Sequence, residues 1–98
     1  MRTPESFEKQ DIRNYLRQRN IWHFMPQGTG FGTNGIPDII GCYKGRFFGI
    51  EVKRPGKKPT PMQFARLAEI EKSGGGGFWG DAEKVLNEFS VWIATIDS

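Results

Sequence analysis

With 98 residues, 37% of them hydrophobic and 13% aromatic, the chain suits a single domain, residues 1–98, around one hydrophobic core. It has no run of 18 apolar residues, no apolar signal segment in its first six residues, and a single cysteine, which excludes an internal disulfide. We therefore expect a cytoplasmic protein without a membrane span, and its net charge of +3 permits a polyanionic partner.

Residues 4–19 are predicted to form the first helix. Thr3 suits the N-cap and Pro4 the first helical position. Three arginines lie on or beside the exposed side of this helix: Arg13, Arg17 and Arg19. They either contact phosphates or form a solvated surface, and we take Arg17 as the candidate for nucleic-acid binding.

A first strand and a glycine-rich loop follow this helix. Residues 21–25 are mostly aromatic and apolar, which is typical of a strand. Residues 28–35 contain four glycines, but they lack the Gly-Lys-Ser/Thr ending of a P-loop and no helix pattern follows. We expect a loop that leads into Asp38 and can approach a DNA backbone closely.

Residues 36–53 contain two short β-prone runs on either side of Lys44-Gly45, which predicts a β-hairpin. Asp38 lies near the start of its first strand, and Glu51 and Lys53 lie near the end of the second. These ends are neighbours in an antiparallel pair, and residues two apart share a face. The hairpin therefore brings two carboxylates and an amine together.

Two adjacent carboxylates repel each other unless a proton or a cation intervenes. Mg²⁺ prefers oxygen ligands and usually takes one or two carboxylates together with waters and phosphate oxygens, so Asp38 and Glu51 suit Mg²⁺ or Mn²⁺. Such a metal polarises a phosphodiester and activates water, while Lys53 orients that water or offsets charge on the phosphate. The alternative is an ordinary surface ion pair on a hairpin.

The segment after the hairpin is basic and leads into a second helix. Three cations in it are candidate phosphate contacts: Arg54, Lys57 and Lys58. Thr60 suits the N-cap of the next helix, with Pro61 at its first position and Gln63 at its third, which is a capping-box arrangement.

The C-terminal third is predicted as a strand, a helix and a further apolar segment. Glycines 74–77 end the second helix, and residues 78–79 start a short edge strand. Asp81 can cap a last helix over 82–89. Residues 90–96 are apolar and β-prone, so we expect them to add a strand or to cover a dimer partner.

The sequence Gly-Ile-Pro-Asp at 35–38, Glu-Val-Lys at 51–53 and Gln63 on the following helix resembles the PD-(D/E)xK nuclease superfamily. It is most similar to the VRR-NUC family in its short stand-alone form, typical of phages, over about residues 5–85. The chain departs from the family at 74–77, where four glycines replace the usual two and a longer apolar strand. The resemblance implies an α/β fold, with a mixed sheet flanked by helices and a hairpin that carries the active site.

The same resemblance implies a divalent-metal-dependent DNA endonuclease that acts as a homodimer on branched DNA such as Holliday junctions, in the cytoplasm of a bacterial host. Its catalytic residues would be Asp38, Glu51, Lys53 and Gln63. Its metal ligands would be Asp38, Glu51 and a glutamate of the first helix, and both Glu5 and Glu8 remain candidates. Either glutamate could instead complement the helix dipole.

Two other classes of function remain as alternatives. The first is a non-catalytic DNA-binding module on the same fold, and the second is an interaction domain that uses an exposed region around Trp92. The complete set of Asp38, Glu51 and Lys53 disfavours the first alternative, because a binding surface has no need of buried acids near phosphates.

Overall fold

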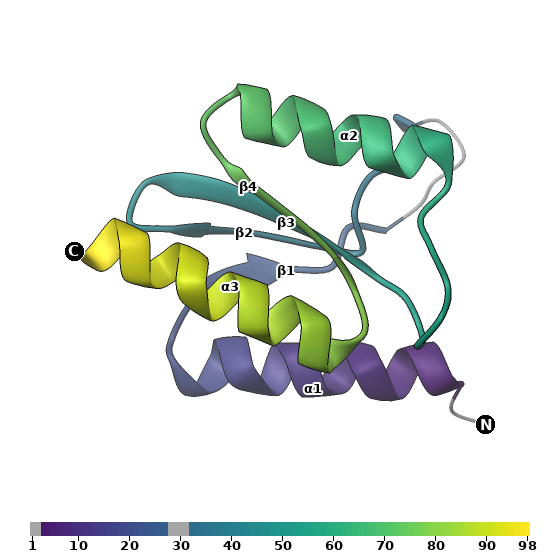
Figure 1. Ribbon diagram of the computed structural model, residues 1–98, viewed down its shortest axis with the longest axis horizontal. Helices are drawn as coiled ribbons and strands as arrows, with labels where there is room; N and C mark the ends of the chain where they lie inside the picture. Colours follow the sequence, from purple (N-terminus) through teal and green to yellow (C-terminus); the bar gives the residue numbers. More distant parts are fainter. Residues whose placement is uncertain (1–2, 28–31) are drawn as a thin grey trace.

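The computed structural model describes residues 3–27 and 32–98, so part of the predicted glycine-rich loop lies outside the described residues. Within these ranges the chain forms three helices and a four-stranded mixed sheet (Figure 1). The elements in chain order are α1 (Pro4–Gln18), β1 (Trp22–Phe24), β2 (Ile39–Tyr43), β3 (Arg46–Val52), α2 (Pro61–Lys72), β4 (Gly76–Gly80) and α3 (Ala82–Asp97). No helix in the described part is long and apolar enough to cross a membrane.

The sheet has the strand order β1-β2-β3-β4, with β4 parallel to β3 and the other pairs antiparallel. The predicted hairpin is confirmed as β2 and β3, and its turn uses positive φ angles of 48° at Lys44 and 84° at Gly45. The helices lie in two layers, with α2 on one face of the sheet and α1 and α3 on the other (Figure 1).

The hydrophobic core lies between the sheet and the α1–α3 layer. Alternation along β3 directs Phe48, Ile50 and Val52 into this core, where all three are fully buried. Glu51 lies between two of these residues and therefore faces the opposite side, toward α2. The other core residues come from α1, from the position just before β1, and from β2, β4 and α3: Ile12, Leu16, Ile21, Ile39, Phe78, Ala82, Val85 and Phe89.

Helix α2 lies close to the sheet because glycines lie beneath it. Gly49 of β3 and Gly77 of β4 are register partners. A Cβ atom at Gly49 would be 2.7 Å from Cδ1 of Ile70, and one at Gly77 would be 3.0 Å from the carbonyl oxygen of Leu67. Larger side chains at these two positions would push α2 away from the sheet and away from Glu51 of β3.

The prediction of a strand over residues 90–96 was wrong, because these residues form the second half of α3, whereas their contact with a dimer partner stays a prediction. The helix is continuous from Ala82 to Asp97. Val85, Phe89, Trp92 and Ile93 all contact the core at helical spacing. Burial of this apolar face outweighs the β-propensity of the individual residues.

The expectation that Trp92 is exposed was also wrong. Trp92 is half-buried, and its ring centroid lies 6.0 Å from that of Phe48 and 5.5 Å from those of Phe78 and Phe89. A Cβ at Gly76 would be 2.7 Å from Cε2 of Trp92, so the glycine run makes room for this indole. The unusual glycines and the C-terminal tryptophan are therefore parts of one packing arrangement.

Replacing Trp92 with alanine is expected to lower the free energy of unfolding by roughly 2–4 kcal/mol, because it removes a large ring from the aromatic cluster. Val91 is the matched control, since it is 65% exposed on the same turn, and Val91→Ala should change stability by less than about 0.5 kcal/mol. Urea unfolding of both variants tests this prediction. Equal stability of the two variants would show that the indole contributes nothing to the core.

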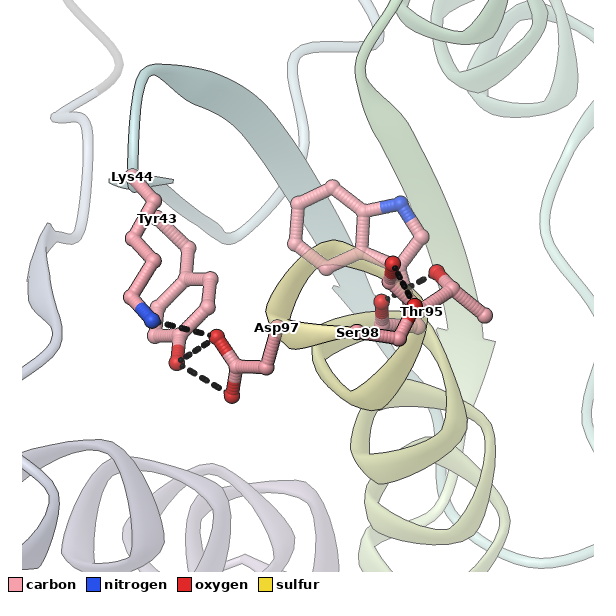
Figure 2. A network of polar contacts seen from close by, with 6 residues as sticks. Tyr43, Lys44, Thr95, Asp97 and Ser98 are labelled. Carbon is pink, nitrogen blue, oxygen red and sulfur yellow. Dashed lines mark hydrogen bonds and ion pairs between the residues drawn. The ribbon is translucent and has the colours of Figure 1, made fainter.

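A polar cluster joins the hairpin turn to the end of α3 (Figure 2). The Tyr43 hydroxyl lies 2.9 Å from both carboxylate oxygens of Asp97, and Lys44 Nζ lies 2.5 Å from Oδ1 of Asp97. The Lys44 ammonium and the Tyr43 hydroxyl lower the pKa of Asp97. Lys44 thereby offsets the unfavourable position of a carboxylate at a helix C-terminus.

Candidate metal-binding and catalytic site

The register of the hairpin places Asp38 beside Glu51. Ile39 pairs with Ile50, so Asp38, one residue earlier, lies opposite Glu51, one residue later. Glu51 points toward α2, where it contacts Gln63, and Asp38 lies close enough to raise the pKa of Glu51. Oδ2 of Asp38 accepts a hydrogen bond of 2.8 Å from the backbone N–H of Val52, which fixes this carboxylate against the end of β3. The convergence of these two acids is the arrangement that the sequence predicted.

Among the residues that the structure describes, Glu51 is the only charged one that is buried, with 3% of its surface exposed. Its Oε1 accepts a 3.0 Å hydrogen bond from Nε2 of Gln63 and lies 3.7 Å from Nζ of Lys53. Its Oε2 is buried and has no hydrogen-bond partner in the described structure. A buried carboxylate oxygen without a partner is costly, and a proton shared with Asp38 or a bound cation would offset this cost.

The electrostatic environment raises the pKa of Glu51 to about 8. Burial is the largest cause, the adjacent Asp38 carboxylate adds to it, and the Lys53 ammonium acts in the opposite direction. Without a cation, Glu51 therefore holds a proton at neutral pH. Strongly perturbed acids of this kind concentrate at functional sites.

Gln63 serves two structural roles at once. Its Oε1 accepts a 2.9 Å hydrogen bond from the backbone N–H of Thr60, and its own N–H donates to Oγ1 of Thr60, which completes the predicted capping box. Its Nε2 donates to Glu51 from the other end of the same amide. The cap thus fixes the orientation of the amide, and the start of α2 positions Glu51.

Lys9 of α1 is a site residue that the sequence did not reveal. Its Nζ lies 3.7 Å from Oδ1 of Asp38, whereas Lys53 contacts Glu51. The Asp38–Glu51 pair is therefore flanked by one ammonium group on each side. Only the packing of α1 against the sheet creates the first of these contacts, so no local motif could have indicated it.

The two candidate glutamates of α1 occupy different places. Oε1 of Glu8 accepts a 3.0 Å hydrogen bond from the backbone N–H of Ala82 and so caps the start of α3. Glu5 lines a hollow of 400 Å³ together with Lys53 and the basic segment 54–58. Within the described residues, no group of three or more acidic, histidine or cysteine side chains is arranged to hold a metal. The structure thus brings Asp38 and Glu51 together, and it does not place Glu5 or Glu8 in one group with them.

The candidate phosphate contacts lie on two sides of the site. Arg54, Lys57 and Lys58 are exposed and line the hollow beside Lys53. Arg17 is exposed on α1, away from this hollow. The basic segment is therefore adjacent to the two carboxylates, whereas Arg17 belongs to a separate part of the surface.

The residues present suit a divalent cation. Asp38 and Glu51 could supply two oxygen ligands, since Oε2 of Glu51 has no hydrogen-bond partner in the described structure. Mg²⁺ commonly completes its shell with waters and phosphate oxygens, so two carboxylates are sufficient. Comparison with known proteins adds no identification, because no family model matches this chain and no curated protein is significantly similar to it.

Proposed function

We propose that this protein is a divalent-metal-dependent DNA endonuclease of the PD-(D/E)xK type, similar to stand-alone VRR-NUC nucleases. The observation that carries the proposal is Glu51, a buried carboxylate with an unpaired oxygen, next to Asp38 and between Gln63 and Lys53. A solvated ion pair would not explain this burial. A surface that only binds DNA would gain nothing from two acids held side by side next to its phosphate contacts.

In the proposed reaction, Asp38 and Glu51 would hold Mg²⁺ or Mn²⁺, which would supply Lewis-acid chemistry toward the phosphodiester and the attacking water. Gln63 keeps Oε1 of Glu51 in place through its hydrogen bond, and the Val52 N–H does the same for Asp38. Lys53, whose side chain is 16% exposed, directs its ammonium group toward the charge that develops on the phosphate.

The proposed substrate is branched DNA, such as a four-way junction, and the proposed active form is a homodimer in the cytoplasm of a bacterial host. These features follow the resemblance at residues 35–38 and 51–53. The surface expected for pairing is now different, because Trp92 packs in the core. We propose the edge strand β1 for pairing instead, because it exposes Trp22 and Phe24. The centroids of these two rings lie 5.4 Å apart.

The proposal is tested by incubating the purified protein with linear duplex, forked and four-way-junction DNA in Mg²⁺ or Mn²⁺, with EDTA as the control. We expect metal-dependent cleavage, fastest on a branched form, and no cleavage in EDTA. Light scattering of the same samples should give twice the mass of one chain. Failure to cut any of these forms with either metal, in a folded sample that binds DNA, would favour a non-catalytic binding module.

A further inference from the structure

Three basic residues form a row along α1 that continues, at the same helical spacing, from Glu5, which lines the hollow beside the basic segment 54–58. Lys9, Arg13 and Arg17 are spaced by four residues, so they follow one face of the helix at intervals of about 6 Å. They line a shallow hollow of 320 Å³ with Ser6, Gln10 and Met25. The row begins at the active site, because Lys9 is the residue whose ammonium lies 3.7 Å from Asp38.

Lys9 is paired with Asp38, but the two arginines of the row have an electrostatic cost that no ion pair in the described structure offsets. Like charges four residues apart destabilise a helix. Burial and, secondly, the charge of Arg17 lower the pKa of Arg13. Neither Arg13 nor Arg17 forms an ion pair with a carboxylate of the described chain, and Nε of the half-buried Arg13 has no hydrogen-bond partner there. Other cations, such as Lys84 and Arg66, do have acidic partners.

We propose that Lys9, Arg13 and Arg17 form a phosphate track that holds the backbone of a DNA arm and leads it to the Asp38–Glu51 pair. This inference rests on the proposed nuclease function and extends the DNA contact about 12 Å beyond the site along α1. The guanidinium groups take phosphates as their missing anionic partners. The basic segment 54–58, which lies beside the first turn of α1, contacts the backbone at the end of the track nearest the site.

The test measures the affinity for a fluorescent branched DNA in EDTA, where no cleavage occurs, over a series of salt concentrations. Arg13→Gln and Arg17→Gln should each weaken binding at low salt by about 3- to 10-fold. Each should also lower the slope of log affinity against log salt by about 1, and the double variant by about 2. Lys72→Gln is the matched control, because it removes the same charge from the far end of α2 and should leave the slope unchanged.

Two outcomes separate this inference from the proposed function. If the wild-type protein cleaves DNA but both arginine variants keep the control's salt slope, the track is refuted and the nuclease proposal stands. If the slopes fall as expected in a protein that never cleaves, the track stands and the nuclease proposal fails. Thermal melting confirms that each variant is folded. In an active protein, the arginine variants should raise KM and leave kcat unchanged, whereas a merely structural defect would lower kcat.

Discussion

Replacing Glu51 with glutamine is expected to abolish cleavage and, at the same time, to stabilise the metal-free protein at alkaline pH. Glutamine keeps the shape of the side chain and its acceptor for Gln63, but it removes the charge that binds the cation. Cleavage should fall at least a hundredfold, the upper end of the loss caused by removing a residue that merely orients a metal ligand. The free energy of unfolding should instead rise at alkaline pH, because the variant lacks the buried charge that Glu51 acquires when it loses its proton.

The pKa of Glu51 is about 8 in the folded protein, against an ordinary value of 4.5. Between these values the folded protein holds a proton that the unfolded chain has lost, so the free energy of unfolding falls as the pH rises from about 4.5 to about 8. The loss is on the order of a few kcal/mol. Glutamine does not titrate, so Glu51→Gln should lack this part of the pH dependence.

Urea unfolding in EDTA at pH 6 and pH 9 measures this effect. The wild-type protein should be less stable at pH 9 than at pH 6. At pH 9 the Glu51→Gln variant should be more stable than the wild type. Glu69→Gln is the control, because Glu69 is an exposed acid on α2. A variant that unfolds like the wild type at both pH values would show that Glu51 is not strained in the metal-free fold.

Replacing Lys53 with alanine is expected to lower kcat by about a hundredfold or more, the scale for losing one group that stabilises developing charge. Lys53 is largely buried and lies 3.7 Å from Glu51, within the proposed catalytic centre. Arg54, the next residue, is exposed and should contact DNA only through its charge. Arg54→Ala should therefore weaken binding and leave kcat unchanged.

Single-turnover cleavage at saturating DNA separates these two effects. The Lys53→Ala protein should remain slow however much DNA is added, because its defect lies in the chemical step. Its DNA affinity should fall only by the equivalent of one phosphate contact. If Lys53→Ala instead reaches the wild-type rate at saturation, Lys53 is a phosphate anchor and another group assists the reaction.

The hairpin and its acids were predictable because their signals are local. Lys44-Gly45 indicates the turn, and the turn fixes which residues face each other, so Asp38 and Glu51 follow from strand register. The capping box of Thr60 and Gln63 was readable for the same reason. The second use of the Gln63 amide depends on how closely α2 approaches β3, which is set by the glycines beneath it.

The features that the sequence did not reveal depend on contacts between distant elements. Residues 90–96 have β-prone side chains, yet the aromatic cluster around Trp92 makes them helical. Lys9 and Glu8 are adjacent on α1, but one contacts Asp38 and the other caps α3. Only the packed positions of α1, α3 and the sheet separate these two roles.

The most direct test of the central claim is to measure Mn²⁺ binding to the protein without DNA. Calorimetry measures this binding, as does the loss of the free Mn²⁺ signal in electron paramagnetic resonance. We expect one Mn²⁺ for each wild-type chain, with affinity that increases as the pH rises toward 8, because the metal displaces the proton of Glu51. Asp38→Asn and Glu51→Gln should each abolish this binding, and Glu69→Gln should preserve it. Unchanged Mn²⁺ binding in a folded Glu51→Gln protein would contradict the assignment of the Asp38–Glu51 pair as a metal site.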